Sequence, residues 1–208
     1  MTRIPPVPAP ARLAVLLSGT GRSLQNLAAA IRSGEVPAEI SFVLSSRPDA
    51  YGLERARKLG LPHAVLNRRD FADSAAFREA VFSRIREFRC DLVLLMGYLQ
   101  LLPIPEDYHG RVLNIHPALL PAFGGKGMYG DRVHRAVLDS GVEETGCTIH
   151  FCDDQYDHGP ILLQRRCPVL PGDTVETLAA RVFEEETRAW PQALRLLISP
   201  PASSHQSS

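Results

Sequence analysis

Residues 12–32, RLAVLLSGTGRSLQNLAAAIR, place a short apolar run, a glycine-containing turn and an amphipathic segment in direct succession. Residues 12–17 predict a buried strand that ends at Ser18-Gly19. Residues 22–32 predict a helix that Gly34 ends, because their apolar residues recur at helical spacing. A strand that leads through a tight turn into a helix is typical of the opening of a βαβ unit.

The same alternation of apolar runs and amphipathic segments continues along the chain. Further strands are predicted at 39–45, 63–66, 91–96, 111–115, 145–152 and 161–169, and further helices at 51–59, 73–88, 131–140 and 174–197. This order predicts an α/β fold, a single Rossmann-like domain whose mostly parallel, twisted sheet carries helices on both faces. Ligands bind such sheets at the carboxyl ends of the strands, so the loops there are the first candidates for a site.

The domain organisation follows from composition. The chain of 208 residues contains no linker-like stretch between residues 11 and 198, so one domain is expected there. Residues 1–10 are Pro-rich and are expected to form a flexible N-terminus, and residues 199–208 are expected to form a disordered tail. The N-terminus lacks the apolar segment of a secretory signal, and no apolar run approaches the roughly 20 residues of a membrane span. We therefore expect a cytoplasmic protein that does not bind membranes.

Charge and cysteine content exclude further classes. The chain has 23 Lys and Arg against 23 Asp and Glu, so it lacks the cationic surplus of a nucleic-acid-coating protein. The cysteines Cys90, Cys147, Cys152 and Cys167 form no CxxC pair. Because a zinc site needs ligands at short spacing, buried free thiols and no metal site are expected.

Two loops at predicted strand ends carry chemistry-bearing residues. The turn Ser18–Ser23 has two glycines before a helix, an arrangement that suits an anion but also suits an ordinary tight turn. Asn114 and His116 lie two apart at the end of a strand, so they project from one face. An amide beside an imidazole can stabilise an oxyanion and move a proton. The alternative is a hydrogen-bonded histidine at a strand end.

A third loop, Asp153–Pro160, is acidic and closes with Gly159-Pro160. It follows the strand that carries His150. A carboxylate from this loop within ~4–6 Å of an imidazole would favour the protonated form of that imidazole. The alternative is a solvated turn.

Taken together, these segments resemble the phosphoribosylglycinamide formyltransferases, folate-dependent enzymes of purine synthesis. The resemblance covers about residues 12–198. It rests on LAVLLSGTGRSLQNL, YGLERARKLG, DLVLLMGYLQLL, LNIHPALLPAF and HFCDDQYDHGPILLQ, in that order along the chain. It implies transfer of a formyl group from 10-formyltetrahydrofolate to the amine of glycinamide ribonucleotide, by direct amine attack and without a metal. It also implies small-molecule partners only, in a monomer or homodimer.

The resemblance assigns roles by matching position. Asn114 would stabilise the oxyanion, His116 would donate a proton, and Asp157 would hold His116 and raise its pKa, with His150 nearby. The ribonucleotide phosphate would bind Gly19, Thr20, Gly21, Arg22 and Ser23, and its ribose would meet Glu186. The folate would be held by Leu99, Gln100, Leu101 and Leu102, together with Asn114, Asp153, Asp154 and Asp157.

Some positions depart from the commoner pattern of the family. Gln100 stands where many members have arginine, and Ser74 stands where some members have an arginine that contacts the folate. The resemblance therefore does not assign the residues that contact the folate tail. His158 and Thr187 replace a frequent glycine and histidine.

Two relatives with the same Asn-His-Asp trio are the nearest alternatives. Formyltetrahydrofolate deformylase carries a further N-terminal domain, and methionyl-tRNA formyltransferase carries a further C-terminal domain and a cationic face, neither of which we expect here. A non-catalytic nucleotide-binding module and a dinucleotide oxidoreductase are the alternatives from other classes.

Overall fold

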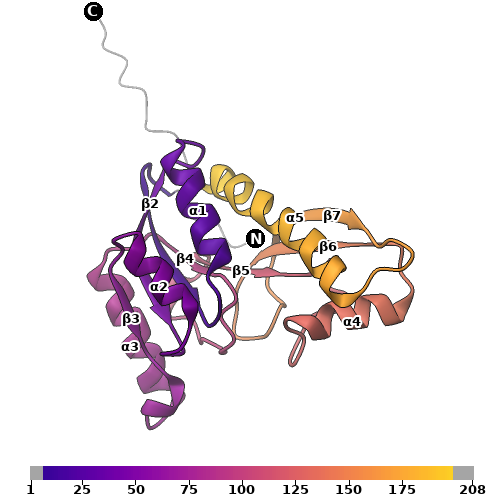
Figure 1. Cartoon of the computed structure of the whole chain (residues 1–208). Coiled ribbons are helices and arrows are strands. Elements are labelled where there is room, and N and C mark those ends of the chain that lie inside the picture. Colours follow the sequence, from indigo (N-terminus) through magenta and orange to yellow (C-terminus); the bar gives the residue numbers. More distant parts are fainter. Residues whose placement is uncertain (1–6, 199–208) are drawn as a thin grey trace, which may run out of the picture.

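The computed structural model describes residues 7–198 (Figure 1). Residues 1–6 and 199–208, which contain most of the predicted flexible ends, lie outside the described residues. The strands are β1 (Ala11–Leu17), β2 (Ala38–Ser45), β3 (His63–Val65), β4 (Leu92–Leu95), β5 (Val112–His116), β6 (Glu144–Phe151) and β7 (Ile161–Pro168). The helices are α1 (Arg22–Arg32), α2 (Tyr51–Lys58), α3 (Ser74–Glu87), α4 (Asp131–Ser140) and α5 (Val175–Leu197). Every predicted strand and helix is present.

The strands form one sheet in the order β3-β2-β1-β4-β5-β6-β7. The pairings from β3 through to β5 are parallel, whereas β5 with β6 and β6 with β7 are antiparallel. The prediction of a mostly parallel sheet is therefore confirmed. The chain leaves β1 toward β2 and β3 and then returns to β4 on the other side of β1. That reversal creates a switch point between the carboxyl ends of β1 and β4.

The central strands are buried on both faces, which explains why they read as unbroken apolar runs. In β1, Leu13, Val15 and Leu17 belong to one buried cluster, and Ala14 and Leu16 belong to the other. The first cluster includes apolar side chains of α1, α2 and α5, and the second includes those of α3. Helices therefore cover both faces of the sheet, as predicted.

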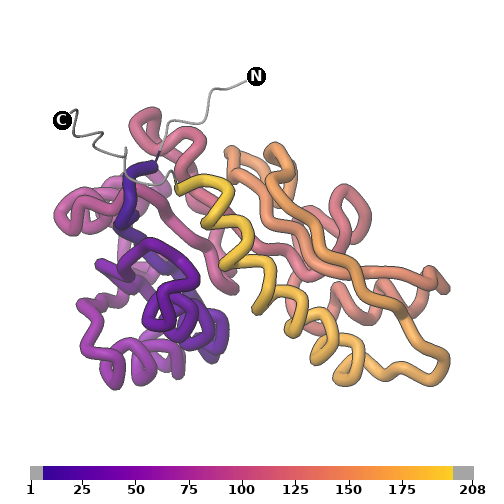
Figure 2. The backbone as a smooth tube through the Cα atoms, turned by 90° about the horizontal axis from the view of Figure 1, so that it is seen from above, coloured from indigo at the N-terminus to yellow at the C-terminus, as the bar shows by residue number. Residues whose placement is uncertain are grey.

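Helix α5 joins the two halves of the molecule. Figure 2 shows it lying between the N-terminal half and the strands β6 and β7, and it contacts α1, β6 and β7. Thr174 caps its N-terminus in a reciprocal pair with Thr177. At its other end, Ile198 forms a parallel bridge with Val7, whose side chain is buried. The chain is therefore packed from Val7 onward, four residues before the expected domain start.

Candidate active site

A cavity of about 650 Å³ opens at the carboxyl ends of β1, β4 and β5, which is within the usual size of a small-molecule pocket. The loops that follow β1 and β4 are hydrogen-bonded to each other beside this cavity. The Ser18 amide donates to the Gly97 carbonyl over 3.0 Å, and the Leu99 amide donates to Ser18 Oγ over 3.0 Å. The cavity therefore lies at the switch point of the sheet.

The turn Ser18–Ser23 is held against α2. Gly21 has φ +72°, and a Cβ there would lie 2.6 Å from the Gly52 Cα. The Gly52 amide donates to the Gly19 carbonyl over 3.0 Å, and Arg55 Nε donates to the Thr20 carbonyl over 2.9 Å. Among residues 7–198 no side chain caps the N-terminus of α1. Its first amides are therefore available to an anion in the cavity.

Strand pairing brings the polar side chains of β5 and β6 together. Asn114 and His116 share a face of β5, and Asn114 is the register partner of His150 in β6. Ile115 and Ile149 pair on the opposite face and belong to the core beneath α5. The predicted common orientation of Asn114 and His116 is thus present in the cavity wall.

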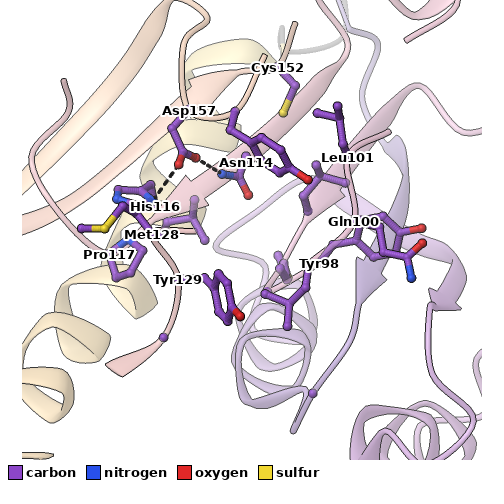
Figure 3. A pocket seen from close by; sticks show the side chains of 18 of the residues that line it. Tyr98, Gln100, Leu101, Asn114, His116, Pro117, Met128, Tyr129, Cys152 and Asp157 are labelled. Carbon is purple, nitrogen blue, oxygen red and sulfur yellow. Dashed lines mark hydrogen bonds and ion pairs between the residues drawn. The ribbon is translucent and has the colours of Figure 1, made fainter. Parts of the chain in front are cut away.

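Asp157 connects Asn114 and His116, as the dashed lines in Figure 3 show, and it also lies close to His150. Asn114 Nδ2 donates to Asp157 Oδ1 over 3.3 Å. Asp157 Oδ2 lies 3.4 Å from His116 Nδ1. Its Oδ1 also lies 3.6 Å from His150 Nε2. The Gly125 amide donates to Oδ2 over 3.0 Å. The Asp157 side chain is only 10% exposed, so the carboxylate depends on these contacts in place of water.

Ring nitrogens of His116 and His150 are also hydrogen-bonded. His116 Nε2 donates to the Phe123 carbonyl over 2.8 Å. His150 Nδ1 donates to the Phe151 carbonyl over 3.0 Å, which leaves its Nε2 to accept from Asn114 Nδ2 over 3.1 Å. Figure 3 shows the amide oxygen of Asn114 turned away from Asp157. Both donor directions of this amide are therefore used within the protein.

Burial and neighbouring charges shift the pKa values of His116 and Asp157 in opposite directions. Burial lowers the pKa of His116 below its ordinary value, and the charge of Asp157 and the Phe123 carbonyl offset part of that shift. Burial has the larger effect, so the net pKa of His116 is lowered, and the raised pKa that the resemblance implies is not seen. Burial raises the pKa of Asp157, yet the charge of a protonated His116 and the hydrogen bond from the Gly125 amide act in the opposite direction, and the net pKa of Asp157 is lowered. The carboxylate is ionised at neutral pH.

The loop that carries Asp157 is tightly folded. Asp157 itself has φ +53°, a left-handed conformation. A Cβ at Gly159 would lie 1.9 Å from the Phe151 carbonyl oxygen, so only glycine fits there. The Phe151 amide donates to the Pro160 carbonyl over 2.9 Å and closes the base of the loop. Asp153 accepts from His158 Nδ1 over 2.7 Å across the same loop.

The structure brings nearly all the predicted site residues to this one cavity. The residues in its wall are Gly19, Thr20, Gly21, Arg22, Ser23, Leu99, Gln100, Leu101, Leu102, Asn114, His116, His150, Asp153, Asp157 and Glu186. Glu186 reaches it from α5, and burial raises the pKa of this carboxyl to about 7 against the opposing charge of Arg22. Asp154 is the exception. It is exposed, lies outside the cavity wall and accepts from the Ile104 amide over 3.4 Å.

Other residues of the cavity wall carry no role in the sequence predictions. They include Tyr98, Lys126, Met128, Tyr129, Arg132, Cys152 and Phe183. The glycine-rich stretch 124–130 signals a loop but not the direction in which it folds. Phe183 is one of several apolar residues of α5, and only the packing of α5 on α1 places it here.

Among residues 7–198 no group of three or more His, Cys, Asp or Glu side chains could hold a metal ion. The four cysteines are free thiols; Cys90, Cys147 and Cys167 are buried, and Cys152 is half-buried in the cavity wall. No helix within the described part of the chain is long and apolar enough to span a membrane.

Comparison with known proteins gives a consistent family. The formyl transferase family model matches residues 11–194. The trifunctional purine biosynthetic protein adenosine-3 of Bos taurus is 43% identical over 194 residues, which are 92% of this chain and 19% of that protein. The phosphoribosylglycinamide formyltransferase of Haemophilus influenzae is 36% identical over 186 residues, 88% of this chain and 85% of that protein. The chain thus spans about a fifth of the trifunctional relative.

Solved structures show the same architecture. Glycinamide ribonucleotide transformylase 1 from Symbiobacterium toebii superposes with a TM-score of 0.84 at 42% identity, covering 89% of this chain and 86% of that one. Phosphoribosylglycinamide formyltransferase from Brucella melitensis superposes with a TM-score of 0.82 at 40% identity, covering 89% and 94%.

Proposed function

Because the chain belongs to the formyl transferase family, we propose that it is a phosphoribosylglycinamide formyltransferase, which moves a formyl group from 10-formyltetrahydrofolate to the amine of glycinamide ribonucleotide in purine biosynthesis. The observation that carries this proposal is the cluster around Asp157. One buried carboxylate contacts Asn114, His116 and His150 in the wall of the cavity that also holds the turn Ser18–Ser23. The names of the relatives support the same reaction.

Each end of the cavity suits one substrate. In the proposal the ribonucleotide phosphate binds the uncapped amides at the start of α1, and the ribose hydroxyls meet Glu186. The folate lies along Leu99–Leu102 and beside Asp153. Between these ends the formyl carbon and the attacking amine lie next to Asn114 and His116.

The chain contributes polarity and proton transfer rather than a nucleophile. Attack of the amine on the formyl carbon builds negative charge on the formyl oxygen, and a donor aimed at that oxygen lowers the barrier. Asn114 Nδ2 is the donor in our proposal. Its hydrogens are directed to Asp157 and His150 in this structure, so the amide must exchange one of these acceptors for the formyl oxygen.

In the same scheme the bond from the formyl carbon to N10 of the folate breaks as the tetrahedral intermediate collapses, and His116 donates a proton to the departing N10. The attacking amine gives up one proton, which restores the protonated His116. The two ring nitrogens of His116 face two acceptors, the Asp157 carboxylate and the Phe123 carbonyl. An imidazolium satisfies both contacts at once, because each nitrogen then carries a hydrogen. Asp157 therefore stabilises the protonated form that burial disfavours. Donation to the substrate requires the bond from Nε2 to Phe123 to be exchanged.

A direct test mixes the protein with 10-formyltetrahydrofolate, with and without glycinamide ribonucleotide, and follows the deformylated folate by absorbance. Turnover that depends on the ribonucleotide is the expected result. His116→Ala should reduce it about 100- to 1000-fold while the fold persists, in line with the loss of one transition-state donor. His63→Ala is the matched control, because His63 is exposed and lies outside the cavity wall.

Turnover at the same rate without the ribonucleotide would contradict the transferase and indicate a hydrolase. Full activity of the His116→Ala variant would contradict the role of the cluster.

A further inference from the structure

The guanidinium of Arg22 lies over an aromatic ring at the proposed ribonucleotide end of the cavity. Its guanidinium carbon is 4.0 Å from the ring centroid of Phe183. Arg22 is the first residue of α1, and Phe183 lies in α5. Both side chains line the cavity, together with Glu186. The contact therefore joins two helices at the point where the turn Ser18–Ser23 enters α1.

A second contact between the same helices lies one turn further along. Asn26 Nδ2 donates to Thr187 Oγ1 over 2.9 Å, and Thr187 Oγ1 donates to the Phe183 carbonyl over 2.9 Å. Residues four apart share a helix face. Arg22 and Asn26 therefore lie on the face of α1 that contacts Phe183 and Thr187 of α5. These paired contacts fix where the Phe183 ring stands relative to α1.

The N–H groups of the Arg22 guanidinium remain available to donate to a ligand. Within residues 7–198 Arg22 makes no ion pair and donates no side-chain hydrogen bond. A guanidinium stacked on a ring face directs its N–H groups outward in its own plane, away from the ring. Two parallel N–H groups match two oxygens of a phosphate monoester. A lysine at this position would lack both the flat stacking surface and the two-point geometry.

We propose that Phe183 is a positioning residue that holds Arg22 for two-point donation to the phosphate of the acceptor, so that this chain selects a phosphorylated acceptor over the same molecule without phosphate. The inference rests on the proposed function, and it adds a residue of α5 to the phosphate site. Phe183 itself does not need to touch the substrate.

The test measures steady-state kinetics of wild type, Phe183→Leu and Phe183→Trp with glycinamide ribonucleotide and with its dephosphorylated riboside. Phe183→Leu should raise KM for the ribonucleotide about 3- to 30-fold, the range for loss of a cation–π contact. Its kcat, its KM for the folate and its kcat/KM for the riboside should stay within about twofold of wild type. Phe183→Trp should retain the wild-type KM, because its ring preserves the stacking surface.

Phe88→Leu is the matched control. Phe88 is also half-buried beneath an arginine, with the Arg84 guanidinium carbon 5.8 Å from its ring centroid, but it packs with the α3 cluster and lies outside the cavity wall. Its kinetics with both acceptors should match wild type.

The outcomes separate the two proposals. An unchanged ribonucleotide KM in Phe183→Leu, or an equal loss with the riboside, would overturn the role of Phe183 while the transferase stands. If wild type shows no ribonucleotide-dependent turnover, the proposed function and this inference both fall.

Discussion

Burial and neighbouring acceptors act in opposite directions on the protonated form of His116. Its side chain is 3% exposed, and burial disfavours its charged form. Yet both of its nitrogens face acceptors, Asp157 Oδ2 at 3.4 Å and the Phe123 carbonyl at 2.8 Å. Asp157 opposes the effect of burial on the protonated form of His116, as the proton transfer proposed for this residue requires.

Replacing Asp157 with asparagine removes the charge and keeps the shape. We expect Asp157→Asn to lower the His116 pKa below its wild-type value, because burial then acts without an opposing carboxylate. The kcat should fall about 100-fold or more. NMR titration of the His116 ring and steady-state kinetics measure the two effects.

Asp154→Asn is the matched control for that variant, because Asp154 lies in the same loop but outside the cavity wall. Its His116 pKa and its kcat should equal those of wild type. An unchanged His116 pKa in Asp157→Asn would contradict the electrostatic role of Asp157.

At the scale of the element, the start of α1 depends on a close approach between two glycines. Gly21 has φ +72°, and an added Cβ would lie 2.6 Å from the Gly52 Cα in α2. The Gly52 backbone cannot yield as a flexible side chain could. The position of the α1 amides in the cavity is therefore set by backbone packing and not by a capping side chain.

Gly21→Ala and Gly34→Ala form a matched pair that isolates this packing. Gly34 also has a positive φ, +79°, but a Cβ there meets nothing within 4 Å. Gly34→Ala should cost about 1 kcal/mol of unfolding free energy from backbone strain alone. Gly21→Ala should cost a further ~1–3 kcal/mol from overpacking and should also raise KM for the ribonucleotide. Denaturant unfolding and kinetics of both variants test this, and equal costs would contradict it.

Local patterns in the sequence predict the elements well because each element follows from nearby residues. The apolar spacing of residues 22–32 and the capping residues around Thr174 are short-range signals. The pairing of Asn114 with His150 and the contact of Phe183 with Arg22 are different in kind. They join residues far apart in the chain, so they depend on sheet register and helix packing that no local pattern encodes.

At the scale of the whole molecule, strand order builds the site. The antiparallel return of β6 places His150 beside Asn114, and the loop after β6 then brings Asp157 over both. The predicted alternation of strands and helices does not reveal this reversal, because a helix, α4, separates β5 from β6 as it would in a parallel crossover. Asp153 and Asp154 show the same limit, because they are adjacent in the loop and yet only Asp153 lines the cavity.

Buried titratable groups make the stability of the whole fold depend on pH with opposing signs. Burial lowers the pKa of His134 in the folded state below its ordinary value of 6.5. As pH falls through 6.5, the unfolded state therefore takes up a proton before the folded state does, and the free energy of unfolding decreases. Burial raises the pKa of Glu186 to about 7, so the folded state takes up a proton first, and stability is gained as pH falls.

Two variants separate these contributions between pH 7.5 and 5.5. Relative to wild type, His134→Gln should show a smaller loss of unfolding free energy on acidification, because a proton-linked loss has been removed. Glu186→Gln should show a larger loss, because a proton-linked gain has been removed. Denaturant unfolding at the two pH values measures both, and the same pH dependence in all three proteins would contradict the assignments.

The fate of the formyl carbon shows whether the protein transfers a formyl group to an amine, as proposed. We would supply 10-formyltetrahydrofolate labelled with ¹³C in the formyl group, together with glycinamide ribonucleotide, and follow the label by NMR. We expect the label to appear as an amide on the ribonucleotide, and Asp157→Asn to slow its appearance. Label found as free formate, or label left on the folate by a folded protein, would rule out the proposed transfer.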